Sequence, residues 1–297
     1  MRCRSNLARR KPVKSILIAP LLGLAFLFPV TAQETGRAPA QPASQQLTPA
    51  QQEAATELNE ATRSYLDGHF EDAELHAEKA LALDPSNKTA PLFIARTLHA
   101  QYKPGDQSEA NVAIARTAIG AYKRLLIQDP RSDEAYKAIA YLYGAVKDEE
   151  LFREWVFRRA VDGSVSDDQR AEAYLVLASR DWDCSFKIIE LPSNQTKTLR
   201  KRRVEIHYTR PKDPAEYEKA HRCATEGLEM IDAAITLAPN SEDAWTYKKE
   251  LLLELAKLSE MDHDLQLRTE YTNQASGADR TAEELRSRKA DSRPIKP

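Results

Sequence analysis

Hydrophobic positions in this chain form one continuous run near its start and then short groups that recur with similar spacing. Residues 15–30 (SILIAPLLGLAFLFPV) are apolar and uncharged, whereas from residue 48 onward small and apolar residues are interspersed with charged ones. Alanine, leucine, glutamate and lysine are common and there are only 9 glycines. Because straight-chain residues lose little rotamer freedom in a helix, the pattern predicts a mainly helical chain after the apolar run.

The start of the chain has the three parts of a secretory signal peptide. Residues 1–14 are basic, residues 15–30 are apolar, and Val30-Thr31-Ala32 places small side chains before polar Gln33. The apolar run is interrupted by Pro20 and Pro29 and is shorter than the roughly 20 residues of a membrane-spanning helix. We expect residues 1–32 to direct export to the periplasm or exterior and to be cleaved after Ala32, leaving no stable membrane span. The alternative is an uncleaved leader that tethers the chain to the inner membrane.

Removal of this leader changes the charge of the chain. The whole sequence has 43 basic and 45 acidic residues, and the six basic residues of the leader leave 37 against 45, a formal net charge of −8. Binding to nucleic acid requires clustered cations that displace counterions from phosphates. The acidic mature chain therefore argues against a general nucleic-acid binder.

Order is expected to begin at Thr48. Residues 33–47 are rich in Gln, Ala and Pro and are typical of a flexible linker. Thr48-Pro49-Ala50-Gln51 then combines a hydroxyl cap, proline at the first helical position and glutamine three residues after the cap. This combination predicts the N-terminus of a helix.

A repeated pattern follows, and its clearest copy runs from Gly68 to Pro85. It contains an aromatic residue after a turn (Phe70), small residues at Ala73, Ala77 and Ala80, and a closing Asp84-Pro85. The ending recurs as Asp129-Pro130 and as Ala238-Pro239. This pattern resembles the tetratricopeptide repeat family, in which each unit is a pair of antiparallel helices and small residues lie where the helices cross.

The resemblance implies an all-α fold, a right-handed superhelical array of about five antiparallel helix pairs over residues 48–274. The first unit matches well and the later ones are degenerate. The last unit has Lys248-Lys249 where a small residue is expected, which suits a solvated capping unit. Residues 275–297 are polar, and we expect them to be a disordered or frayed tail.

The fourth unit departs from the family pattern by an insertion at about residues 185–213. Phe186–Glu190 and Val204–Tyr208 are rich in β-branched and aromatic residues, which predicts a small β-hairpin. The dense basic run of the insertion is a candidate contact for an acidic partner or phosphate, or a solvated strand edge that blocks aggregation. Its members are Lys197, Arg200, Lys201, Arg202 and Arg203.

The mature chain keeps two cysteines, Cys184 before the insertion and Cys223 in the helix after it. An even count in an exported chain suggests one disulfide. Two alternatives remain, namely reduced thiols and a metal site with the nearby His221.

Catalytic motifs are missing from the sequence, which contains no His-Glu-x-x-His, no Gly-x-Ser-x-Gly and no phosphate loop. We therefore expect no catalytic residue, cofactor or metal, and a non-catalytic scaffold that binds a protein or peptide partner outside the cytoplasm. The alternative is an enzyme or carrier with a thiol- or metal-dependent site around Cys184, Cys223 and His221.

The resemblance also implies where a partner binds. Members of the family line a concave groove with outward residues of each first helix. Carried over by position, these residues are Leu92, Arg96, His99, Lys137, Tyr141, Leu175, Ser179 and Trp182. Their mixed aromatic and basic character suits an extended peptide with some acidic residues. The competing interpretation is that Tyr141 and Trp182 pack between helices, as aromatic residues at helical spacing usually do.

Overall fold

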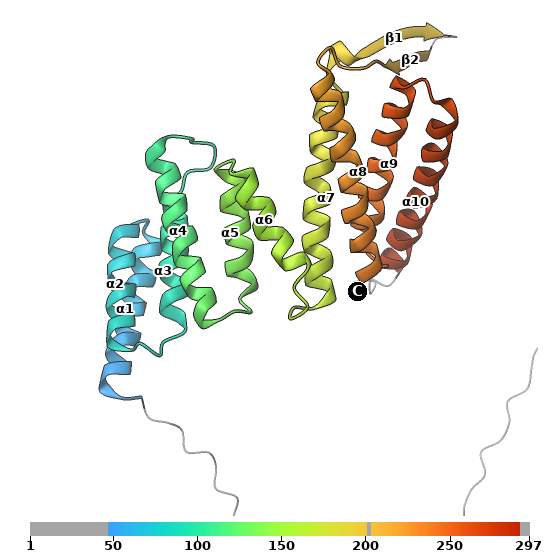
Figure 1. The fold of residues 1–297 in the computed structure, drawn as a ribbon. Coiled ribbons are helices and arrows are strands. Elements are labelled where there is room, and N and C mark those ends of the chain that lie inside the picture. Colours follow the sequence, from blue (N-terminus) through green and yellow to red (C-terminus); the bar gives the residue numbers. More distant parts are fainter. Residues whose placement is uncertain (1–46, 201–202, 292–297) are drawn as a thin grey trace, which may run out of the picture. The chain divides into compact units, whose positions relative to one another are not determined.

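The computed structural model describes residues 47–200 and 203–291, which form helix pairs and a single hairpin (Figure 1). The predicted leader, most of the predicted linker and two members of the basic run, Lys201 and Arg202, lie outside the described residues. No helix within the described ranges has both the length and the apolar character needed to cross a membrane.

Within the described residues, ten α-helices pair in sequence order as five antiparallel units, and each helix contacts mainly its neighbours. This confirms the expected all-α array of about five helix pairs. The bounds are α1 Pro49–Leu66, α2 Phe70–Leu83, α3 Thr89–Gln101, α4 Glu109–Gln128, α5 Asp133–Ala145, α6 Glu149–Ala160, α7 Asp167–Ile189, α8 Pro214–Leu237, α9 Glu242–Met261 and α10 Leu265–Asp291.

Local sequence signals account for many of these helix ends. Thr48 caps α1, and its reciprocal hydrogen bonds with Gln51 form the expected capping box. Asp84 and Asp129, each before a proline, have non-helical backbone with φ of −132° and −128° and end α2 and α4. A proline disfavours helical backbone in the residue before it, so the same dipeptide stops both helices.

Three units have the same turn geometry between their helices, although the residue at the turn differs. Gly68, Lys147 and His263 have positive φ of 79°, 60° and 61° between the two helices of the first, third and fifth units. In each case the next residue's N–H donates to a carbonyl five positions back, as from His69 to Ser64. This is the bonding pattern of a left-handed helix ending, and glycine adopts it at the least cost.

The insertion is shorter than expected, because α7 continues to Ile189. The prediction of a strand at Phe186–Glu190 is therefore wrong: these residues close the helix, and Ile189 is fully buried against α8 and α9. A short 3₁₀ helix, Pro192–Asn194, leads into β1 (Gln195–Arg200), which pairs antiparallel with β2 (Arg203–Tyr208). The predicted hairpin is present, with Gln195 opposite Tyr208, but its first strand lies later in the chain.

The end of the domain also differs from expectation. The final helix, α10, continues past residue 274 to Asp291, so residues 275–291 are not a disordered tail. Ala275, Ala278 and Ala282 recur at helical spacing and are buried, in a helix whose packing partner is α9. This segment is polar because most of its side chains lie on the exposed face of a terminal helix. The residues that it buries are all alanines.

Candidate functional site: the outer face of the first helices

Arg96 links the first helices of the second and third units. Its Nε and Nη2 donate to the two carboxylate oxygens of Glu134 on α5, both at 2.5 Å. The hydrogen bond from Arg96 lowers the pKa of Glu134 below its ordinary value. This predicted groove cation is therefore matched by a carboxylate of the next unit, and both side chains remain about half exposed.

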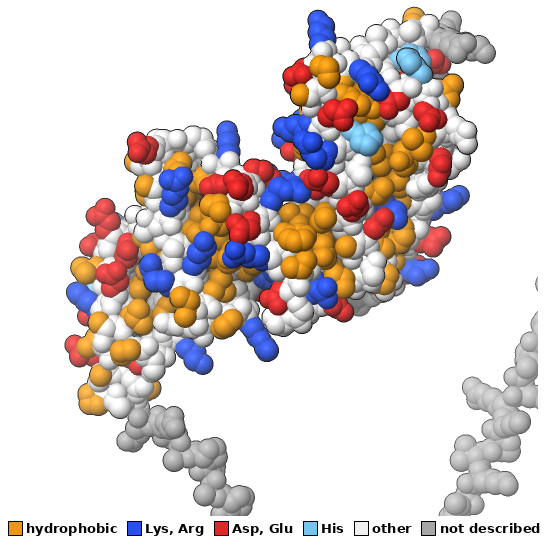
Figure 2. Space-filling model, viewed as in Figure 1, with side chains coloured by type: hydrophobic (Ala, Val, Ile, Leu, Met, Phe, Trp, Pro, Cys, Tyr) orange, Lys and Arg blue, Asp and Glu red, His pale blue; other side chains and the backbone are white. Residues whose placement is uncertain are grey.

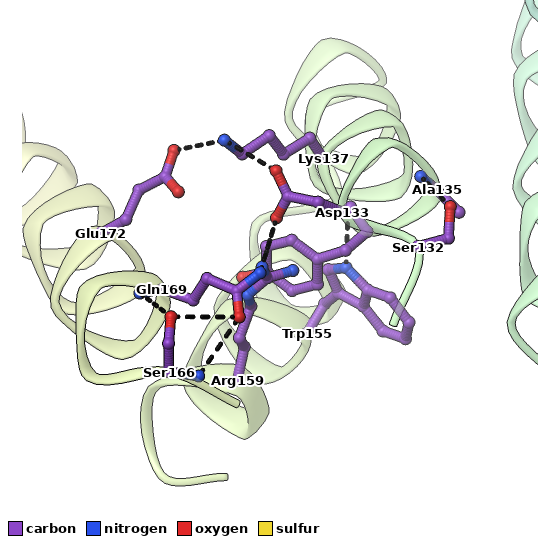
Figure 3. Close-up of polar contacts among 10 residues, drawn as sticks. Ser132, Asp133, Ala135, Lys137, Trp155, Arg159, Ser166, Gln169 and Glu172 are labelled. Carbon is purple, nitrogen blue, oxygen red and sulfur yellow. Dashed lines mark hydrogen bonds and ion pairs between the residues drawn. The ribbon is translucent and has the colours of Figure 1, made fainter. Parts of the chain in front are cut away.

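A second set of polar contacts links the third and fourth units (Figure 3). The Lys137 ammonium lies between Asp133, at 3.0 Å, and Glu172 of α7, at 2.8 Å. The other Asp133 oxygen accepts from the Arg159 guanidinium, which is buried over the ring of Tyr136. Burial raises the pKa of Asp133, but the hydrogen bonds from Lys137 and Arg159 outweigh this effect and lower it. The carboxylate is thus held ionised at a junction of three helices.

Aromatic side chains lie one helical turn further along α3 and α5, after Arg96 and Lys137. His99 Nδ1 is 3.3 Å from the Tyr122 hydroxyl, and the His99 ring lies 5.6 Å from that of Tyr141. Burial lowers the pKa of His99, which favours the neutral imidazole, and raises the pKa of Tyr122 to about 12. Tyr141 is 48% exposed, so it presents an aromatic surface to solvent, whereas Leu92 packs against the core.

The three predicted groove residues on α7 lie in different surroundings. Trp182 lies between helices, with its ring 5.9 Å from Tyr247 of α9 and 5.0 Å from Phe186. Ser179 donates to the carbonyl of Val176 on its own helix. Leu175 lines a cavity of about 550 Å³ between α7, the end of α8 and the start of α9. Of these three residues, only Leu175 lines that cavity.

Two acidic residues that were not among the predicted groove residues line the same cavity. Asp168 and Glu172 lie one turn apart on α7, on the face that also carries Ala171 and Leu175. Their spacing of three and four residues was visible in the sequence. The cavity itself was not, because α8 and α9 supply its other walls.

The insertion is anchored at its base by a charged cluster. Glu190 accepts hydrogen bonds from Lys257 of α9 at 2.6 Å, from the Tyr208 hydroxyl at 3.0 Å and from Gln195 at 2.7 Å. Of the basic run, Lys197 is exposed on β1, and Arg200 is the strand partner of Arg203. Leu199 and Val204, a cross-strand pair, are also exposed.

Cys184 and Cys223 form a disulfide that joins α7 to α8, as the even cysteine count suggested. The bond uses both sulfurs, so neither cysteine is a free thiol in this structure. His221 lies beside the ring of Tyr217, with centroids 6.3 Å apart. Among residues 47–200 and 203–291, no group of three or more His, Cys, Asp or Glu side chains is arranged to hold a metal ion.

The surface of Figure 2 shows hydrophobic patches over the helices, with Lys, Arg, Asp and Glu side chains interspersed between them. This mixture gives the visible face no single sign of charge. Recognition on such a face depends on local pairs and pockets more than on long-range attraction.

Comparison with known proteins gives similarity in structure alone. No protein-family model matches the sequence, and no curated protein matches it. A crystal structure of MamA protein is 15% identical, with a TM-score of 0.43 over 83% of this chain and 99% of that one. Pseudomonas aeruginosa pilF is 13% identical, with a TM-score of 0.36 over 82% and 100%. YrrB, described as a TPR protein with an unusual peptide-binding site, is 13% identical, with a TM-score of 0.35 over 74% and 92%. The assignment of the fold rests on the helix pairs of the chain itself.

Proposed function

We propose that this protein is a non-catalytic interaction scaffold that acts outside the cytoplasm. It binds an extended segment of a partner protein in a concave groove that is lined by the outward-pointing residues of α3, α5 and α7. The observation that supports the proposal most directly is the exposed ring of Tyr141, placed on the same face as the Arg96–Glu134 and Lys137–Glu172 pairs. Ion pairs between consecutive units restrain the side chains of this face, which reduces the entropy lost when a partner binds.

The ion pairs of Arg96 and Lys137 limit the kind of partner that can bind this face. Arg96 and Lys137 already have carboxylate partners, so an acidic peptide must compete with Glu134, Asp133 and Glu172. The aromatic surface of Tyr141 faces no such competition. Aromatic side chains contribute large contact areas at interfaces with little loss of conformational entropy. The central contact of the proposed interface is therefore apolar, and the ion pairs border it.

Site-specific photo-crosslinking tests this proposal. A photoreactive phenylalanine analogue replaces Tyr141 on α5 in one variant and Phe157 on α6 in another; the two native side chains are 48% and 45% exposed. We expect a discrete crosslinked partner from position 141 only, reduced at least tenfold by Arg96→Glu. Equal crosslinking from both positions, or none from position 141, would contradict binding at the first helices.

The proposed location has a separate test. N-terminal sequencing of the protein from fractionated cells is expected to begin at Gln33 in the periplasmic or secreted fraction. A membrane fraction that retains Met1 would instead indicate a tethered form, and a cytoplasmic protein would contradict export.

A further inference from the structure

The cavity of about 550 Å³ beside Leu175 lies where the fourth and fifth units meet. One wall is a single face of α7, a second is the last turn of α8, and the third is the start of α9 with the connecting Pro239–Ser241. The cavity lies next to the proposed interaction face, because Glu172 both lines it and accepts from Lys137 of α5. A partner segment lying along α5 and α7 would pass its opening.

The floor of the cavity is apolar and made mainly of small side chains. Ala171, Ala234 and Ala244 are each at most 6% exposed, and Leu175 and Leu237 complete the floor. These residues leave space above their methyl groups that larger side chains would fill. The floor can accept a flexible aliphatic stem, because burial of methylene groups on an apolar surface is favourable.

The charged side chains that line the cavity all have one sign. Asp168 and Glu172 are the only ionisable side chains that line it, and no Lys or Arg does so among the described residues. No hydrogen bond or ion pair joins Asp168 to another side chain of the part of the chain that the structure describes. The helix dipole at the start of α9 favours anions, but Glu242 and Asp243 occupy that first turn and offset it.

We infer that this cavity binds the side chain of a lysine or arginine of the partner protein. The aliphatic stem packs on the alanine and leucine floor, and the cationic end pairs with Asp168 and Glu172. Long basic side chains suit a site with an apolar base and a charged rim, because their methylenes and their charge are separated. The inference rests on the proposed function and adds to it the chemistry of one partner residue.

The Lys137 contact does not prevent this pairing. Lys137 also pairs with Asp133, at 3.0 Å, so it keeps a carboxylate partner when an incoming cation takes Glu172. An acidic ligand would be repelled by Asp168 and Glu172, and no cation within the described ranges lines the cavity to pair with it. The cavity therefore selects by charge as well as by shape.

A titration with model peptides tests the cavity without knowledge of the natural partner. The probes are acetyl-Ala-Leu-X-Leu-Ala-amide peptides in which X is arginine, citrulline or glutamate, and the readout is the NMR shift of the Leu175 and Leu237 methyl groups. Citrulline matches arginine in shape but is neutral. We expect saturable shifts with the arginine peptide, at least tenfold weaker binding of the citrulline peptide and none of the glutamate peptide.

Matched variants locate the effect. Asp168→Asn combined with Glu172→Gln is expected to weaken binding of the arginine peptide at least tenfold. Glu216→Gln combined with Glu218→Gln removes the same charge from exposed positions in the first turns of α8 and is expected to change binding less than twofold. Circular dichroism confirms that both proteins are folded.

Three results would overturn the inference: equal binding of arginine and citrulline peptides, preference for the glutamate peptide, or no shift at Leu175 and Leu237 with any peptide. The crosslinking test is independent of these outcomes. Crosslinking at position 141 without binding of the arginine peptide refutes the cavity alone. Binding of this peptide without crosslinking at position 141 supports the cavity inference and refutes the proposed interaction face.

Discussion

Small residues allow the helices of this protein to approach one another closely. Ala61, Ala77, Ala95 and Ala135 are fully buried within the main core cluster. Gly227 of α8 is a more extreme case, because a Cβ there would lie 2.7 Å from Leu251 and 2.9 Å from Asp181. At the residue scale, the fold therefore requires alanine or glycine where helices touch, as well as the large side chains that fill the core.

Buried charges are the second feature at this scale. Glu254 is 1% exposed, accepts from Lys257 at 2.7 Å, and its other oxygen has no partner among the described residues. Burial raises the pKa of Glu254 above its ordinary value, despite the neighbouring ammonium. Lys257 also pairs with Glu190, so loss of the Glu254 charge leaves it with a carboxylate.

We predict that Glu254→Gln changes how stability depends on pH. The folded protein holds this proton more tightly than the unfolded chain. The stabilising contribution of the Glu254 carboxyl is therefore complete below its unfolded pKa, about 4.3, and is lost as pH rises through the raised folded pKa. Glutamine stays neutral, so the stability of the wild type relative to Glu254→Gln should fall as the pH rises above about 4.3 and through the raised pKa of the folded protein. Urea unfolding measures the difference, with exposed Glu229→Gln as the control; a constant difference would contradict the shift.

At the scale of elements, composition alone predicted two segments incorrectly, and packing explains both differences. The prediction that Phe186–Glu190 is a strand was wrong because the same apolar residues, placed at the end of a long helix, bury Ile189 against α8 and α9. Residues 275–291 were expected to fray because they are polar, yet their alanines bury a narrow stripe in α10. A short apolar run is compatible with strand or helix, and only its partners decide between them.

The disulfide is the covalent link between α7 and α8, across the insertion. We predict that Cys184→Ala combined with Cys223→Ala lowers the free energy of unfolding by about 4 kcal/mol, because the bond restrains a loop with a sequence separation of 39 in the unfolded chain. Urea unfolding measures this loss. Reduced wild-type protein is a control without altered side-chain volume and should lose a similar amount; no effect of reductant would contradict the prediction.

At the scale of the whole described domain, contacts join mainly consecutive helices. α1 to α4 pack on one another in chain order, as do α7 to α10, and few contacts bridge elements distant in sequence. Stability in such an array is approximately a sum of unit and nearest-neighbour terms. A local change should therefore have local consequences.

We predict that Ala77→Leu, which overfills a fully buried site on α2, destabilises its neighbourhood by about 1–3 kcal/mol. Amide hydrogen exchange should accelerate within α1–α4 and change little within α9–α10. Exposed Lys79→Leu, two residues away, is the matched control and should leave both regions unchanged. Equal acceleration in α9–α10 would show that the domain unfolds as one unit.

The sequence by itself determined the features that depend on neighbouring residues: the start of α1 at its capping box, the Asp-Pro helix ends, the alanine positions where helices cross and the second strand of the hairpin. Each follows from backbone sterics or side-chain size within a few residues. The tertiary structure alone decided the partners of Arg96 and Lys137, the packing of Trp182 against α9, the extent of α10 and the cavity at Asp168 and Glu172. Those features join residues that are distant in the chain, and their geometry exists only once the helices have packed.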